Sequence, residues 1–128
     1  MWTEQEEKNL RAVPNFYEVI INGRQYERAG QSLDDNYFQH KAEAETGTQG
    51  VLDFVRSVYD QAPLRKARTV RSSVDGDYVI LRVHITNAAE APNLAVIDVF
   101  RAEDGKLMEH WDVASAVPET AGNANGVF

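Results

Sequence analysis

The sequence has 128 residues, of which 43% are hydrophobic and 26% charged, values that are typical of a single globular domain spanning residues 1–128. The chain contains no cysteine, which excludes disulfides and thiol catalysis and favours a cytoplasmic location. A net charge of −7 argues against nucleic acid as a partner, and no apolar run approaches the roughly 18 residues that cross a membrane.

The first half of the sequence predicts helices. Residues 3–22 begin with a capping box, Thr3-Glu4-Gln5-Glu6, and continue with apolar side chains at helical spacing. Pro14 lies inside this segment and should kink or break the helix, because proline lacks the amide hydrogen and clashes with the preceding turn. Further along we expect a short helix over residues 25–33, a turn over 34–36, an extended exit over 37–40, and a third helix from the cap Thr48 to Pro63.

The second half of the sequence predicts strands. Asp75-Gly76 is typical of a type I′ turn and would join strands over residues 69–74 and 77–85. A polar connection is expected at residues 87–93, and a second hairpin is centred on Asp104-Gly105.

The order of these elements, helices first and then an antiparallel meander, indicates an α+β fold. Helices packed against the concave face of a curved sheet would enclose a cone-shaped pocket, which suits a small apolar molecule held by a few polar groups. The tail, residues 114–128, is expected to be an extended segment on the surface.

Three ionisable residues, Asp98, His110 and Asp112, lie among the apolar residues of the second hairpin, where an unpartnered charge is costly. A three-residue loop ending at Gly105 would pair Asp98 with His110 and Val96 with Asp112, so that all three polar groups share one face. A two-residue loop would instead pair Asp98 with Trp111. We favour the first register because it gathers the polar side chains on one face.

Several segments resemble the SnoaL-like polyketide cyclase family, which belongs to the nuclear transport factor two-like superfamily. The resemblance is carried by Tyr37-Phe38-Gln39-His40, Val74-Asp75-Gly76-Asp77, Val83-His84-Ile85, Asp98-Val99-Phe100-Arg101, Glu109-His110-Trp111-Asp112-Val113 and the terminal Gly122–Phe128. The sequence departs from the family pattern at Lys41-Ala42, where relatives often carry asparagine-proline, and at Pro14.

This resemblance implies an α+β cone with an internal cavity, usually dimeric through the sheet. Characterised cyclases of the family use a carboxylate as general acid/base in an intramolecular aldol condensation, without a metal or a cofactor. The superfamily also contains isomerases, dehydratases, epoxide hydrolases and binding proteins without activity, so the fold alone does not fix the chemistry.

The candidate catalytic residues are Asp98, His110 and Asp112. Either aspartate could be the general acid/base and His110 a proton shuttle, since imidazole can gain or lose a proton near neutral pH. Equally, Asp98 could be a structural carboxylate satisfied by His110 or Arg82. The candidate substrate-binding residues are Tyr17, His40, Phe54, Arg82, His84, Phe100 and Trp111. For His84 a dimer interface, and for Trp111 simple packing, remain alternatives.

We expect no metal site, because no closely spaced pair of histidines of the kind found on metal-binding helices occurs in the sequence. Two functions remain open. The first is an enzyme that performs cofactor-independent cyclisation or isomerisation of an enolisable, apolar or polyketide-like substrate. The second is a small-molecule-binding protein without activity, or an enzyme of the dehydratase or epoxide hydrolase type.

Overall fold

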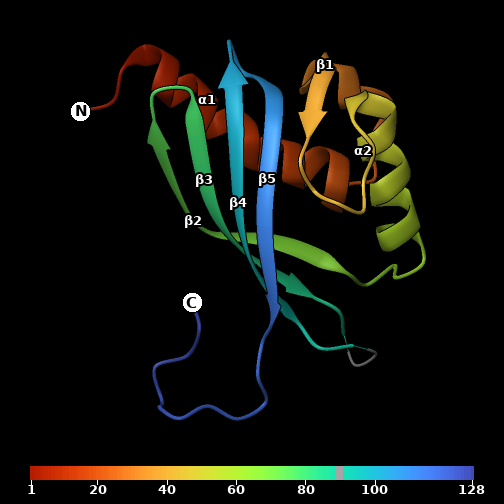
Figure 1. Ribbon diagram of the computed structural model, residues 1–128, viewed down its shortest axis with the longest axis vertical. Coiled ribbons are helices and arrows are strands. Elements are labelled where there is room, and N and C mark those ends of the chain that lie inside the picture. Colours follow the sequence, from red (N-terminus) through yellow and green to blue (C-terminus); the bar gives the residue numbers. More distant parts are fainter. Residues whose placement is uncertain (89–90) are drawn as a thin grey trace.

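A computed structural model of the chain describes residues 1–88 and 91–128 (Figure 1). Five strands form one sheet in the order β1-β5-β4-β3-β2. They are β1 (Leu33–Gln39), β2 (Lys66–Asp75), β3 (Tyr78–Thr86), β4 (Leu94–Glu103) and β5 (Lys106–Ala116). Strands β2 to β5 form an antiparallel meander, and β1 joins the free edge of β5 in parallel.

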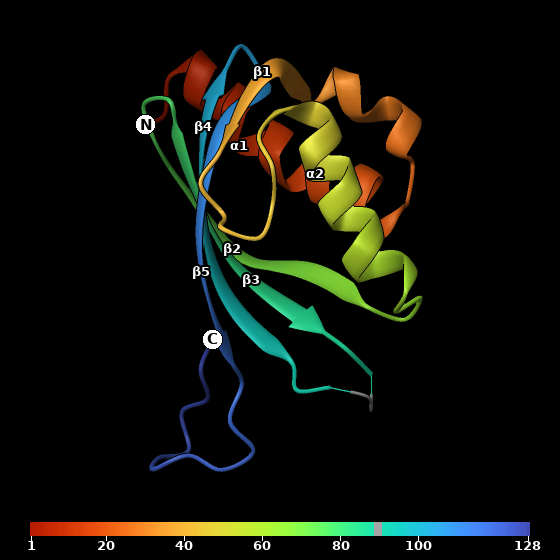
Figure 2. The same ribbon diagram turned by 45° about the vertical axis from the view of Figure 1, so that its right-hand side comes forward.

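All helices lie on one side of this curved sheet (Figure 2). They are α1 (Glu4–Phe16), η1 (Tyr17–Asn22), η2 (Tyr26–Gln31), α2 (Gly47–Val55) and η3 (Arg56–Asp60). We call the face that they cover the inner face and the opposite one the outer face. The predicted α+β fold, a curved sheet packed against helices, is therefore confirmed.

The first helix begins as predicted, because the Thr3 hydroxyl accepts a hydrogen bond from the Glu6 amide and the Glu6 carboxylate accepts one from the Thr3 amide. The predicted break at Pro14 is wrong. The helix continues through it and widens to π-helical η1 only from Tyr17. Val13 and Phe16, on either side of the proline, are buried in the core. The stabilisation from packing this helix face outweighs the loss of the one backbone hydrogen bond that proline cannot donate, so the helix stays unbroken.

The region after this helix differs most from the prediction. The second helix is only the short 3₁₀ segment η2, and residues 34–36, expected to form a turn, belong to β1. The strand is irregular at these turn-forming residues. The Asn36 backbone amide donates to the Asp34 carboxylate, and the pairing register with β5 shifts between Leu33 and Phe38. The third helix, α2, begins after Thr46 rather than Thr48.

The two hairpins have tight turns of different kinds. In the first, Gly76 and Asp77 form the turn and only Gly76 has a positive φ, so the predicted type I′ turn at Asp75-Gly76 is wrong and a II′-like turn replaces it. In the second, Asp104 and Gly105 both have positive φ, as a type I′ turn requires.

The register of the second hairpin matches neither alternative considered from the sequence. Glu103 pairs with Lys106, and Met108 then forms a bulge, so that Phe100 faces His110 and Asp98 faces Asp112. A two-residue turn alone would place His110 and Asp112 on the face opposite to Asp98. The extra residue of the bulge shifts the pairing by one position and returns them to the face of Asp98. The expectation that the polar side chains share one face therefore holds, although the pairs differ.

The core lies between the inner face and the helices. In β3 and β4 buried residues alternate with more exposed ones, and Asp98 occupies one of the inward positions between Val96 and Phe100. The tail beyond β5 is irregular, and its last residues return to the sheet, where the Val127 carbonyl accepts a hydrogen bond from Arg82. No helix among the described residues is long and apolar enough to cross a membrane. The predicted connection at residues 87–93 includes positions 89 and 90, which lie outside the described residues.

Candidate functional site

A cavity of about 140 Å³ lies between the inner face of the sheet and the helices α1, η1, α2 and η3. Most of its lining is apolar, with side chains such as Phe54, Val55, Val96 and Phe100. Its polar lining includes Tyr17, Tyr37, Gln39, Lys41, Tyr59, Arg65, Asp98, His110 and Asp112. The three candidate catalytic residues therefore line one cavity, together with Tyr17, Phe54 and Phe100 from the candidate binding residues.

A chain of hydrogen bonds crosses the buried end of the cavity. Asp98 Oδ1 lies 2.7 Å from His110 Nε2, and the Tyr17 hydroxyl donates to Asp98 Oδ2 at 2.5 Å. On the other side of the imidazole ring, His110 Nδ1 lies 2.8 Å from Gln39 Oε1. Asp98 and His110 are only 3% and 6% exposed, so protein groups rather than bulk solvent supply these partners.

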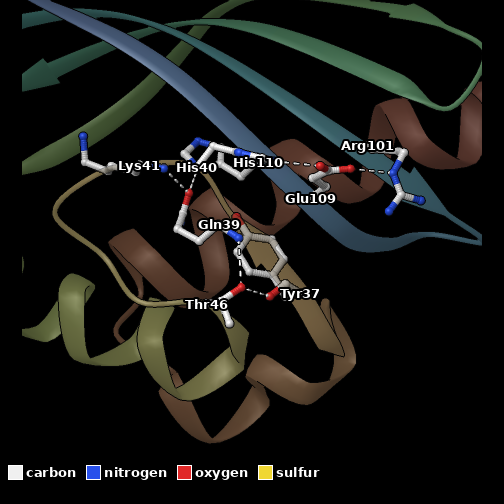
Figure 3. A network of polar contacts seen from close by, with 8 residues as sticks. All are labelled: Tyr37, Gln39, His40, Lys41, Thr46, Arg101, Glu109 and His110. Atoms are coloured by element: carbon white, nitrogen blue, oxygen red, sulfur yellow. Dashed lines mark hydrogen bonds and ion pairs between the residues drawn. The ribbon is translucent and has the colours of Figure 1, made fainter.

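The position of Gln39 decides where His110 carries its protons (Figure 3). Gln39 Oε1 accepts a hydrogen bond from the Lys41 backbone amide at 2.9 Å, which orients the side-chain amide and turns its oxygen towards His110. Because a carbonyl oxygen only accepts, His110 Nδ1 must donate. His110 Nε2 and the Asp98 carboxylate then share a single proton, which can reside on either atom.

Asp112 has a different partner. Its carboxylate lies directly across the strand pair from Asp98, and Oδ2 is 2.9 Å from the Lys41 ammonium. The two side chains are 13% and 20% exposed, and the ammonium also lies 5.4 Å from the centre of the Phe54 ring. The cavity thus contains two carboxylates in separate roles, one sharing a proton with an imidazole and one paired with a fixed positive charge.

The tyrosines of the cavity are held in the protonated form. Burial, reinforced by the charge of Asp98, raises the pKa of Tyr17 well above its ordinary value, and burial likewise raises the pKa of Tyr37. Burial also raises the pKa of Tyr59 to about 12, although nearby Arg65 opposes the shift. Their hydroxyl groups are therefore available as hydrogen-bond donors at any physiological pH.

His40 and Trp111, two of the candidate binding residues, lie outside the cavity lining. Their rings stack 4.7 Å apart. His40 Nε2 is 2.8 Å from the Glu109 carboxylate, which in turn accepts a hydrogen bond from Arg101 at 3.0 Å (Figure 3). The hydrogen bonds from His40 and Arg101 hold the pKa of Glu109 below its usual value. Strand alternation explains why they lie outside the cavity. His40 follows Gln39 and Trp111 follows His110 in the chain, so both point to the face opposite to the cavity.

Arg82 and His84 also lie outside the cavity lining, because they alternate with the buried Leu81 and Val83. The His84 ring lies 4.3 Å from the ring of Phe128, and the Arg82 guanidinium is 5.2 Å from the same ring. His84 Nε2 is buried and has no hydrogen-bond partner among the described residues. These two side chains thus anchor the tail on the outer face, and a contact of Arg82 with Asp98 is excluded.

The sequence did not single out Gln39, Lys41 and Tyr37 as site residues. Gln39 and Tyr37 were visible only as parts of a motif, and Lys41 only as a departure from the family pattern. That departure was the one signal that could have identified Lys41.

Asp98, His110 and Asp112 are also the group that could hold a metal ion, with one donor atom of each within 4.8 Å of the others. These donors already have partners, because both imidazole nitrogens are engaged and the Lys41 ammonium contacts Asp112. A positive charge at this position disfavours a further cation. The donor set therefore fits proton transfer better than it fits metal binding.

Comparison with known proteins agrees with this architecture. The family profile described as the SnoaL-like domain matches residues 13–110. Among curated proteins, none matches the sequence significantly.

Solved structures provide further relatives in fold. A proposed polyketide cyclase from Bacillus cereus is 23% identical, with 84% of this chain and 74% of that chain covered and a TM-score of 0.73. A SnoaL-like polyketide cyclase from Agrobacterium tumefaciens is 15% identical, with 84% and 91% covered and a TM-score of 0.71. A proposed ketosteroid isomerase from Kribbella flavida is 17% identical, with 94% and 88% covered and a TM-score of 0.74. These likenesses show a shared α+β cone fold.

Proposed function

Because the chain belongs to the SnoaL-like domain family, we propose that its cavity catalyses proton transfer at a carbon beside a carbonyl group, leading to aldol-type cyclisation or isomerisation. The observation that carries this proposal is the Asp98–His110 pair, which shares one proton inside a mostly apolar cavity. Proton transfer by a positioned side chain is typically worth about 10²–10⁴-fold in rate. The proposed reaction requires neither a metal nor a cofactor.

In the proposed reaction the Asp98–His110 pair takes up one proton from the substrate carbon and leaves an enolate. In an isomerisation the pair returns that proton to another carbon of the same substrate. In a cyclisation the enolate carbon attacks a second carbonyl group of the substrate, and the resulting alkoxide takes the proton. Tyr17 holds the carboxylate of Asp98 and Gln39 holds the imidazole of His110, so the pair keeps its geometry throughout.

Of the two aspartates, Asp98 suits the acid/base role better. Asp112 faces the Lys41 ammonium, which stabilises its charged form and competes for its oxygen. Asp98 instead shares its proton with His110, which lies on the neighbouring strand β5 and projects from the same inner face. Asp112 therefore serves to position Lys41 in the cavity wall.

The size of the cavity limits the substrate. A volume of about 140 Å³ is close to that of engineered cavities of about 150 Å³ that bind benzene. The enclosed part thus suits one ring of a small, largely apolar substrate. The side chains of Phe54, Ile85 and Leu94 in the lining are partly exposed, so longer substrates can extend between them.

Hydrogen exchange of cyclohexanone tests this proposal, because enolisation in D₂O replaces its α-protons with deuterium, a change that NMR detects. We expect the protein to accelerate the exchange and Asp98→Asn to reduce the acceleration at least a hundredfold while the fold is retained. Asp53→Asn is the matched control, since Asp53 is exposed on α2, does not line the cavity, and its carboxylate accepts a hydrogen bond from Gln49. Full activity of the Asp98→Asn variant would remove Asp98 from the mechanism.

A second function is supported by the complete pairing of Asp98 and His110, which is also what a purely structural network requires. In this case the cavity binds a small apolar molecule without changing it. The wild-type protein would then not accelerate exchange of cyclohexanone, and Asp98→Asn would lower the melting temperature only.

We further propose that two copies associate through the outer face of the sheet. Two apolar side chains that face each other there, Ile97 and Val113, are 39% and 73% exposed. A cytoplasmic location stays a prediction from the sequence, which cell fractionation can check.

A further inference from the structure

We propose that the Lys41 ammonium binds a negatively charged oxygen of the ligand, so that the cavity selects carboxylates and enolates over neutral molecules of the same shape. The inference rests on the proposed function in one respect, since it places the ligand in the same cavity. It adds the chemical class of the ligand and a residue that determines specificity.

The charges of the cavity wall support this inference. The Asp98–His110 pair with its shared proton is neutral overall, and the ion pair of Asp112 and Lys41 is neutral as well. The remaining charged residue of the described lining is Arg65. Its guanidinium donates to uncharged acceptors, the side-chain oxygen of Asn87 and the carbonyl of Val58. The described lining therefore carries one excess positive charge, although the chain as a whole carries −7. This local reversal of sign favours an anion in the cavity.

The position of Lys41 makes it the group that an anion would contact. Its side chain is only 20% exposed and is held in the wall by Asp112 and the Phe54 ring. An ammonium group has three hydrogen-bond donors, and the contact with Asp112 at 2.9 Å uses one of them. The other acidic neighbour, Glu43, is 3.7 Å away and does not reach hydrogen-bonding distance. Donors thus remain for an oxygen that enters the cavity.

The position of Lys41 beside Asp112, which is itself a neighbour of the acid/base pair, suits an enolisable ligand. Asp112, which contacts Lys41, has a carboxylate oxygen within 4.8 Å of donor atoms of Asp98 and His110. Lys41 and the acid/base pair are thus both neighbours of the Asp112 carboxylate in the cavity wall, and we expect a ligand oxygen bound at Lys41 to bring its adjacent carbon near the pair. As the enolate forms, the negative charge develops beside a fixed ammonium in a site of low dielectric, where the interaction is stronger than in water.

Binding of benzoate and of benzamide tests the inference without any turnover. The two molecules have nearly the same shape, and only benzoate is charged at neutral pH. We expect the wild-type protein to bind benzoate at least tenfold more tightly than benzamide, measured by isothermal titration calorimetry or NMR titration. Lys41→Met should reduce this ratio at least tenfold, whereas Lys41→Arg, which keeps the charge, should retain most of it.

The ratio of benzoate affinity to benzamide affinity is measured on each variant separately. A general loss of cavity shape would weaken the binding of both ligands and leave this ratio unchanged. Lys66→Met is the matched control, since Lys66 is exposed on β2 and does not line the cavity. An equal ratio in wild type and Lys41→Met, or no binding of either molecule, would overturn the inference. A benzoate preference that depends on Lys41, in a protein that does not exchange cyclohexanone, would support this inference and refute the proposed catalysis.

Discussion

Asp98 and His110 are not paired across the hairpin, yet their side chains meet at 2.7 Å. Asp98 faces Asp112, and His110 faces Phe100, so the contact runs along the diagonal of two neighbouring pairs. The His110 ring lies 4.6 Å from the ring of Phe100, which supports it from one side. Because the contact is diagonal, the position directly facing Asp98 is occupied by Asp112. Asp112 contacts the Lys41 ammonium and thereby places it in the same part of the cavity wall as the acid/base pair.

Removing the Tyr17 hydroxyl should weaken both the fold and the proposed activity. Tyr17→Phe leaves one oxygen of the buried Asp98 carboxylate without its donor, which costs about 1–3 kcal/mol of unfolding free energy. Urea denaturation measures this loss. Tyr26→Phe is a matched control, because it removes a similar bond of 2.6 Å to Asp60 at an exposed site. Equal losses for the two variants would show that the burial of the Tyr17 contact adds no stability.

The proton on His110 Nδ1 can be observed directly. Nitrogen-15 NMR of the imidazole ring should show Nδ1 as the protonated nitrogen in the wild-type protein, since Gln39 Oε1 only accepts. Gln39→Leu removes this acceptor, and the signals should change to those of a mixture of ring forms. The same variant should lose about 1–3 kcal/mol of stability, because a buried donor stays without a partner. A wild-type spectrum with a proton on Nε2 alone would contradict the arrangement.

Much of the fold could be predicted because it depends on local patterns. The capping box at Thr3, the glycines of the two hairpins and the alternation of apolar residues each act within a few positions of the chain. The common face of Asp98, His110 and Asp112 follows from the same alternation.

Features that depend on distant parts of the chain could not be predicted in this way. The bulge at Met108 carries no glycine to mark it, so the sequence suggested a wrong register. Strand β1 contains three turn-forming residues at positions 34–36 and is a strand only because it pairs with β5. Lys41 reaches Asp112 across 71 positions of sequence, and local periodicity contains no information on such a contact.

Alkaline pH should destabilise the protein through its buried tyrosines. Burial raises the pKa of Tyr17 and of Tyr37 in the folded state, while the unfolded chain releases these protons above an ordinary pKa of about 10. Their contribution is therefore complete below about pH 10 and is lost as the pH rises further, by about 1.4 kcal/mol per pH unit for each group.

The variant Tyr37→Phe separates this effect from a general loss of stability. It should reduce the slope of unfolding free energy against pH, measured above pH 10, by about 1.4 kcal/mol per pH unit. Phe16→Leu is the control, because it weakens the same core without removing a titrating group. If both variants have the wild-type slope, Tyr37 does not stay protonated in the folded protein.

The proposed association through the outer face makes a prediction for Val113. This side chain is 73% exposed and faces Ile97 on the neighbouring strand, and a second copy of the sheet would cover both. The wild-type protein should therefore elute as a dimer in size-exclusion chromatography with light scattering, and Val113→Glu should shift it to the monomer because burial of an unpaired charge is costly. Cyclohexanone exchange should persist in this variant, since Val113 lies on the face opposite the cavity.

Leu64 provides the control for that experiment. It is 72% exposed, nearly as much as Val113, but lies in the loop after η3 rather than on the sheet. Leu64→Glu adds the same charge to the surface and should leave the dimer intact. A monomeric wild-type protein, or equal dissociation in both variants, would show that the exposed residues of the outer face do not form the interface.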